Sequence, residues 1–263
     1  MDVAAAFDQT IFGIRLADLW QFIAIGFAAQ VVDGALGMAF GAIANTLLIG
    51  VVGMPPAQAS YRVHIIKCFT AAASGISHFL SGNVDNRMFL RLLLPGVIGG
   101  AIGAYGLSNV DAAVIKPLVL GYLALLGVIL LLRGMRDTYE KGTARHVGPL
   151  GFLGGLLDAI GGGGWGPVVS SSLMLQGTEP RKVVGTVNSA EFFIAVIIAG
   201  TFLGQLGGEA LLAPTIGLLV GGVAAAPFGA MAAKYLPTNF MLVLVGSVLS
   251  ASSTIGLYML LET

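Results

Sequence analysis

Two stretches of the sequence, residues 114–132 and 240–261, are apolar over almost their whole length. A helix needs about 20 mostly apolar residues to cross the hydrocarbon core of a bilayer, so each stretch is long enough to span a membrane. The composition agrees, because 56% of the 263 residues are hydrophobic and 10% are charged. Soluble domains carry about a quarter charged residues. We therefore predict an all-α integral membrane protein whose solvent is largely the lipid bilayer.

An internal repeat divides the chain into two homologous halves. Residues 33–41 (DGALGMAFG) align with residues 158–166 (DAIGGGGWG), and each segment runs from Asp through glycines to an aromatic residue followed by glycine. The elements that follow also correspond, which is expected of a duplicated architecture. They are a long helix at 57–80 and 181–203, a glycine-rich span at 92–107 and 215–233, and a last span at 114–132 and 240–261. The predicted units are a first transmembrane repeat at 1–134, a polar cytoplasmic linker at 135–146 and a second repeat at 147–263.

The glycine-rich segment that opens each half is the least regular part of the pattern. Residues 20–52 are too many for one straight crossing, and the central glycines oppose a continuous helix. The segment forms either one broken crossing or a re-entrant hairpin of two half-helices. The positive-inside rule favours the hairpin, because the basic linker and the loops at Arg87 and Arg181 then share the cytoplasmic side. Each half then has three full transmembrane helices plus this segment, and the halves are inverted repeats, as in many secondary transporters.

At these motifs the sequence resembles the sulfite exporter TauE/SafE family. The two Asp-glycine motifs carry the resemblance together with PRKVVGT at 180–186 and SGNVD at 81–85, and it extends from about residue 20 to the C-terminus. It implies a multi-pass anion transporter of the cell inner (plasma) membrane that exports sulfite or an organosulfonate such as sulfoacetate. The segment SYRVHIIK at 60–67 departs from the small and hydroxyl residues usual there, which suggests a more negatively charged or larger organic substrate.

Two charged residues lie deep inside the long helices. Lys67 and Glu191 each follow a proline, Pro56 and Pro180, by 11 residues. At about 1.5 Å per residue, this places both about 16 Å into the helix, near the middle of the membrane. A charge there costs about 2.5–3.5 kcal/mol, so it needs a reason. We expect Lys67 to bind the substrate anion and Glu191 either to take up a coupling proton or to balance Lys67; the alternative is a structural ion pair.

Polar neighbours of these charges are further candidates for substrate binding. His64 precedes Lys67 by three positions and therefore shares its helix face, although a hydrogen-bonded helix contact is the alternative. Arg62 points to another side, toward a different cavity or the interface. Asn188 and Ser189 lie at the matching depth in the second half. They would bind anion oxygens or form hydrogen bonds between helices.

The glycine-rich breaks themselves could bind an anion. A helix that restarts inside the membrane exposes backbone N–H groups, and its dipole attracts negative charge. Candidate donors lie around Gly37, Gly163 and Gly164, and Ser171 could add a hydroxyl one turn further on. The alternative is that these glycines only permit close packing.

An aspartate opens each break. Asp33 and Asp158 are placed to cap the N–H groups of the following half-helix. The alternative is that they bind a proton or another coupling ion.

Several function classes lack support in the sequence. His64, His78 and His146 do not have the spacing of metal ligands, and Cys68 is the only cysteine, so we predict no metal site. No P-loop or nucleophile–base pair is present, so neither an enzyme nor a cofactor is predicted. The net charge of zero gives no basic surface for nucleic acid. The alternatives that remain are a passive anion channel or facilitator and a carboxylate transporter.

The oligomeric state depends on how one glycine stripe packs. Gly96, Gly99, Gly100 and Gly103 lie on one face of a predicted helix and would allow close helix contact. The contact lies either within one protomer or between two, so a homodimer is possible.

Overall fold

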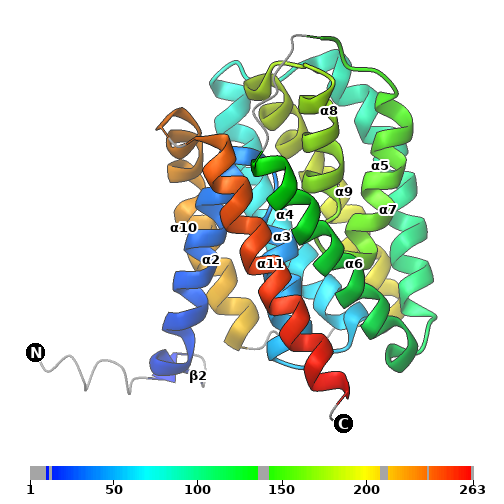
Figure 1. Ribbon diagram of the computed structural model, residues 1–263. Helices are drawn as coiled ribbons and strands as arrows, with labels where there is room; N and C mark the ends of the chain where they lie inside the picture. Colours follow the sequence, from blue (N-terminus) through cyan, green and yellow to red (C-terminus); the bar gives the residue numbers. More distant parts are fainter. Residues whose placement is uncertain (1–9, 12–13, 136–141, 208–212, 236, 262–263) are drawn as a thin grey trace, which may run out of the picture.

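The computed structural model describes residues 10–11, 14–135, 142–207, 213–235 and 237–261 (Figure 1). The described elements are helical except for β1 (Thr10–Ile11) and β2 (Ile14–Arg15), a short antiparallel pair that the sequence analysis did not predict. The helices are α2 (Leu16–Leu36), α3 (Phe40–Thr46), η1 (Leu47–Val51), α4 (Pro56–Leu80), α5 (Asn86–Ser108), α6 (Ala112–Gly134), α7 (Val147–Gly161), η2 (Gly166–Ser170), α8 (Ser171–Leu175), α9 (Pro180–Leu206), α10 (Ala213–Tyr235) and α11 (Thr238–Leu261). The predicted all-α class is confirmed.

Five of the described helices are long and apolar enough to cross a membrane: α2, α4, α5, α6 and α9. The two long helices begin at prolines, as expected, because proline suits the first turn, where its missing N–H is not needed. Helix α5 begins with a side-chain cap, since the Asp85 carboxylate accepts from the backbone N–H groups of Arg87 and Met88. These local signals explain why the helix boundaries lie close to those expected from the sequence.

The glycine-rich segments form two hairpins. In Figure 1 α2 begins at the lower end of the molecule, and the chain returns to that end after α3 and η1. The second segment begins and ends at the upper end. There the Gly142 N–H donates to the Gly177 carbonyl at 2.9 Å, so the residues before α7 lie beside those after α8. The chain thus reverses direction within each segment, as the hairpin alternative requires.

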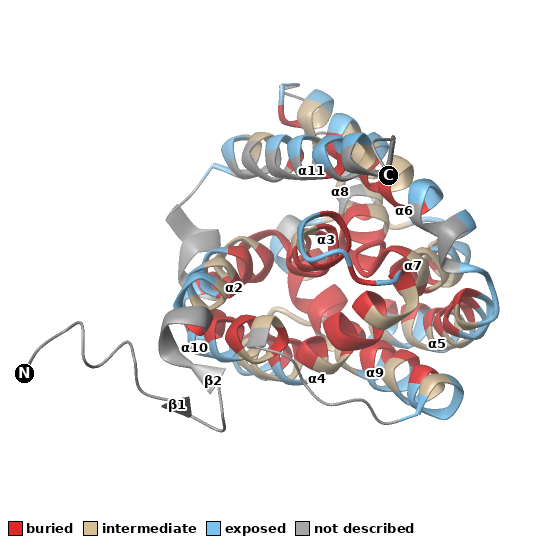
Figure 2. Ribbon diagram, turned by 90° about the horizontal axis from the view of Figure 1, so that it is seen from below, coloured by how far each residue is buried: buried red, intermediate tan, exposed pale blue. Residues whose placement is uncertain are grey.

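The main helix pairs join one half of the chain to the other. Helix α2 packs along α10, α5 along α7, α4 along α9 and α6 along α11. Seen from below, α3 lies in the middle of a ring of helices, and the buried residues concentrate there (Figure 2). The ends of both hairpins are therefore held inside a wall to which both halves contribute.

Glycines permit the close approach of these pairs. A Cβ at Gly99 would lie 2.1 Å from the Phe152 carbonyl oxygen, and one at Gly103 would lie 2.6 Å from that of Leu156, so α5 contacts the α7 backbone directly. Gly96 and Gly100 of the same stripe face Ile194 and Ile198 of α9. The stripe Gly96-Gly99-Gly100-Gly103 therefore packs within one protomer, which is the first of its two alternatives.

Candidate functional site

Two aspartates hold the breaks in the hairpins. The Asp33 carboxylate at the end of α2 accepts a hydrogen bond from the Phe40 N–H, with N and Oδ1 3.1 Å apart. The Asp158 carboxylate at the end of α7 does the same for the Trp165 N–H at 3.2 Å. Both residues thus satisfy an N–H that the interrupted helix leaves without a partner. The capping role expected for them is confirmed.

The backbone at the breaks needs unusual conformations. Gly37 and Gly162 both have a φ of +65°, in the left-handed region where glycine pays no steric penalty. Ala39 has a φ of 127°, which is rare for a residue with a Cβ and costs on the order of 1–3 kcal/mol. Such strain persists only where the surroundings fix it, and the tight packing of the breaks provides this constraint.

The broken tips of the two hairpins contact each other by equivalent hydrogen bonds. Asn45 Nδ2 donates to the Gly161 carbonyl at 2.6 Å, and Ser170 Oγ donates to the Gly37 carbonyl at 2.9 Å. The tips are so close that a Cβ at Gly41 would lie 1.9 Å from the Gly162 carbonyl oxygen. The two breaks therefore form one buried unit at the centre of the bundle.

The glycines proposed to bind an anion lie within this contact. A Cβ at Gly163 would lie 2.2 Å from the Ala42 nitrogen, and one at Gly164 would lie 2.5 Å from the Leu157 carbonyl carbon. Close backbone packing is thus one role of these glycines. Anion binding by Gly37, Gly163 and Gly164 stays a prediction, and the side chain of Ser171 lies outside the described residues.

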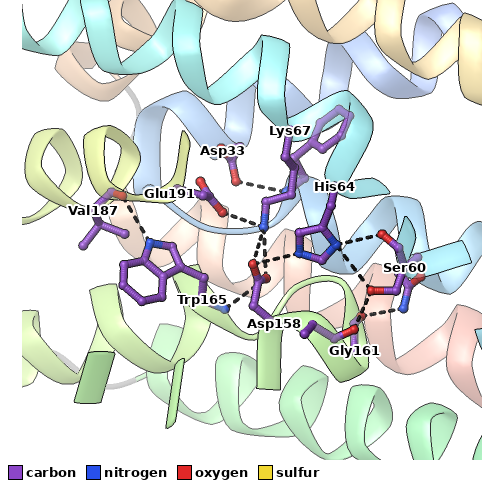
Figure 3. A network of polar contacts seen from close by, with 12 residues as sticks. Asp33, Ser60, His64, Lys67, Asp158, Gly161, Trp165, Val187 and Glu191 are labelled. Atoms are coloured by element: carbon purple, nitrogen blue, oxygen red, sulfur yellow. Dashed lines mark hydrogen bonds and ion pairs between the residues drawn. The ribbon is translucent and has the colours of Figure 1, made fainter. Parts of the chain in front are cut away.

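A cluster of charged side chains lies next to this unit (Figure 3). Lys67 Nζ, from α4, is 2.9 and 3.0 Å from the two carboxylate oxygens of Asp158 on α7. It is also 2.6 Å from Glu191 Oε1 on α9. The three residues are at most 3% exposed, so these ion pairs form away from solvent, where unpaired charges would be costly. The pair of Lys67 with Glu191 was expected from the sequence, whereas the contact of Asp158 with Lys67 was not.

His64 joins the cluster with both ring nitrogens. Its Nε2 is 3.1 Å from Asp158 Oδ2, and its Nδ1 is 2.7 Å from the Ser60 carbonyl oxygen. A carbonyl and a carboxylate are both acceptors, and the Ser60 hydroxyl already donates to the Ala159 carbonyl. Both imidazole nitrogens therefore lie within hydrogen-bond distance of an oxygen acceptor. The joint position of His64 and Lys67 on one helix face is confirmed by their shared partner.

The remaining predicted residues lie around this cluster in different ways. Arg62 is buried on α4. Ser189 donates its hydroxyl to the Gly185 carbonyl at 2.8 Å and lines an apolar cavity of ≈ 390 Å³. Asn188 is fully buried, and neither its amide nitrogen nor its amide oxygen has a hydrogen-bond partner among the described residues.

Gln30 was missed by the sequence analysis. It is fully buried on α2, and both polar atoms of its amide lack a partner within the described part of the chain. It precedes Asp33 by three residues, as Asn188 precedes Glu191, so each amide shares a helix face with a carboxylate. The signal was visible in the sequence as an amide inside an apolar run.

The structure offers no metal centre in the residues it describes, where no group of three or more His, Cys, Asp and Glu side chains could hold an ion. The chemistry available at the cluster is that of charges and hydrogen-bond donors, which can bind an anion or exchange a proton.

The model of the family described as "Sulfite exporter TauE/SafE" matches residues 22–256. The chain belongs to this family. A curated relative, the "Probable membrane transporter protein YtnM" of Bacillus subtilis (strain 168), is 42% identical over 234 residues, which are 86% of this chain and 78% of the relative. No solved structure matches the chain. This TauE/SafE member is therefore a multi-pass membrane transporter and not an enzyme, and the resemblance noted in its sequence is confirmed.

Proposed function

We propose that this TauE/SafE protein is a secondary transporter that exports a small sulfur-containing anion, such as sulfite or an organosulfonate like sulfoacetate. The anion binds near the middle of the membrane, between two inverted repeats of residues 1–134 and 147–263. The observation that carries the proposal is the buried ammonium of Lys67, held by carboxylates from α7 and α9. A buried charge that belongs to a transport protein is expected to lie on the substrate path.

The substrate site is centred on the Lys67 ammonium, and His64 lies beside it through the Asp158 carboxylate that both residues contact. Asn188 adds an amide whose polar atoms have no partner among the described residues, and such a group is expected to find one in a ligand. Ser189 and Arg62 extend the site along the same two helices. Glu191 serves as the coupling or gating residue, because it shares Lys67 with Asp158.

The inverted arrangement is supported by the two hairpins, which enter the bundle from opposite ends (Figure 1). The end that carries Arg87, Arg145, Arg181 and Lys182 is assigned to the cytoplasm by the positive-inside rule. Lys182 Nζ donates to the Gly82 carbonyl at 2.8 Å, so these basic loops are neighbours. In this orientation the second hairpin enters from the cytoplasm and the first from outside.

The test is flux into liposomes that contain the purified protein. Sulfite, sulfoacetate and a carboxylate of matched size are each offered with and without a pH gradient, and protein-free liposomes give the background. Selective flux of the sulfur anions that the gradient stimulates is the expected result. Equal flux of the carboxylate would mean that the protein does not select sulfur-containing anions, and the substrate class would then include carboxylates. Flux that no ion gradient changes would favour a passive facilitator instead.

A further inference from the structure

Every donor of the proposed anion-binding lysine is already in use. The Lys67 ammonium has three N–H groups. It contacts both carboxylate oxygens of Asp158 and one of Glu191. An anion can therefore bind this ammonium only after one of the two carboxylates has withdrawn.

The two carboxylates are held very differently. Asp158 also accepts from His64 Nε2 at 3.1 Å and from the Trp165 N–H at 3.2 Å, so it is fixed by α4 and by its own hairpin. Glu191 has Lys67 as its only hydrogen-bond or ion-pair partner within the described ranges. Breaking the single contact of Glu191 costs less free energy than breaking the four contacts of Asp158. Glu191 is therefore the carboxylate that an anion displaces from the Lys67 ammonium.

The charges of the cluster determine whether a proton must bind when an anion replaces Glu191 on Lys67. Glu191 is a counter-charge of Lys67 and has no second ion-pair partner among the described residues. Once a proton neutralises Glu191, the buried ammonium has lost that counter-charge, a state that costs several kcal/mol. An anion that binds Lys67 restores the balance. An anion that arrives without the proton adds a negative charge to the site instead.

Several other titratable groups lie near Glu191. They are Lys67 and His64 from α4, Asp158 from α7 and Asp33 from α2. Helix α5 contributes Phe89, which packs against Phe193, and η2 has no charged residue. Because Asp158 is held by its further contacts, proton uptake and anion uptake are linked at Glu191.

From this arrangement we propose that the protein carries one proton on Glu191 together with each monovalent anion on Lys67, in the same direction and without net charge movement. The inference rests on the proposed function. The proton binds the carboxylate from the solution on one side and is released to the other side when the anion leaves. An outward anion gradient then suffices for export, and an inward proton gradient favours uptake.

The test uses a small monovalent sulfonate, because a sulfonate stays ionised and cannot itself carry the proton across. Proteoliposomes contain a pH-sensitive dye, and labelled sulfonate reports anion movement. One proton is expected to enter per anion, and an imposed potassium-diffusion potential is expected to leave the initial rate unchanged. A gradient of about one pH unit is expected to hold an anion gradient of about tenfold at equilibrium, since each unit equals about 1.4 kcal/mol.

Two variants separate the inference from the proposed function. Glu191→Gln keeps a neutral side chain in place, so it is expected to exchange labelled for unlabelled sulfonate, whereas a pH gradient is expected to drive no net sulfonate uptake. The control is Glu179→Gln, whose carboxylate lies 3.6 Å from Arg181 at the surface and is 59% exposed; it is expected to behave like the wild type. Net sulfonate uptake by the wild type without proton entry, or an uptake rate set by the membrane potential, overturns the symport inference alone. No exchange of any anion overturns the proposed function and the inference with it.

Discussion

Asp33 and Asp158 accept the same backbone hydrogen bond, each from the residue seven positions ahead, yet only Asp158 also contacts Lys67. The difference comes from the long helices beside them. Lys67 and His64 of α4 contact Asp158 in the second hairpin, and Glu191 of α9 contacts the same lysine. The two aspartates thus cap their breaks in the same way, but only Asp158 also belongs to the ion-pair cluster.

We expect amide substitutions of these two aspartates to differ in their effect on stability. Asparagine keeps the oxygen that caps the break, so Asp33→Asn should lower the free energy of unfolding by at most about 1 kcal/mol. Asp158→Asn also removes the buried negative charge that pairs with Lys67, and should cost about 3–5 kcal/mol. Unfolding of the purified variants in detergent, followed by circular dichroism, measures both. Equal losses would show that the ion pairs of Asp158 contribute little.

The pair of Lys67 and Glu191 should show strong coupling in a double-mutant cycle. Lys67→Met removes the ammonium that two buried carboxylates share and is expected to cost about 3–5 kcal/mol. Adding Glu191→Gln should recover part of this loss, with a coupling energy of about 0.5–3 kcal/mol. The exposed pair of Glu179 and Arg181 is the control, for which coupling should stay below about 1 kcal/mol. Additive effects for the buried pair would argue against a direct interaction.

Much of this architecture could be predicted from the sequence, because the decisive signals are local. Helix ends follow Pro56 and Pro180, and the charges of Lys67 and Glu191 are conspicuous in apolar runs at the same distance from those prolines. The contact of Lys67 with Asp158 could not be predicted in this way. It joins residues 91 positions apart and depends on how deeply a hairpin inserts into the bundle.

The two buried amides illustrate the same limit. The sequence places Asn45 and Asn188 in comparable apolar surroundings, yet Asn45 donates to Gly161 whereas the amide of Asn188 has no partner among the described residues. Only the packed structure distinguishes a structural amide from one that is open to a ligand.

This difference leads to a prediction for transport. Asn188→Leu removes an amide without a described partner, so the free energy of unfolding should stay the same or rise, while anion transport falls if the amide binds substrate. Asn45→Leu, the matched control, breaks a buried hydrogen bond of 2.6 Å and should destabilise the protein by about 1–3 kcal/mol. Flux and unfolding are measured on the same preparations. Wild-type flux in Asn188→Leu would remove Asn188 from the substrate site.

The contact between the hairpin tips predicts a steric effect. In Gly41→Ala the new methyl group would lie 1.9 Å from the Gly162 carbonyl oxygen, so the tips must separate, at a cost of about 1–3 kcal/mol or more. Gly106→Ala places its methyl group where no atom lies within 4 Å, and it should be neutral or stabilise helix α5 by up to about 1 kcal/mol. Thermal unfolding of both variants in detergent provides the comparison. A neutral Gly41→Ala would mean that the tips are farther apart than described.

The hairpin topology predicts which side of the membrane can label introduced cysteines. In a Cys68→Ser background, Thr143→Cys precedes the second hairpin and Glu179→Cys follows it, so a membrane-impermeant maleimide should reach both from the same side. Val52→Cys follows the first hairpin and should be labelled from the opposite side, because the two hairpins enter from opposite ends (Figure 1). Labelling is compared in intact cells and inverted vesicles. If Glu179→Cys were labelled together with Val52→Cys instead, the segment from α7 to α8 would cross the membrane, and the basic ends of α5 and α9 would lie on different sides.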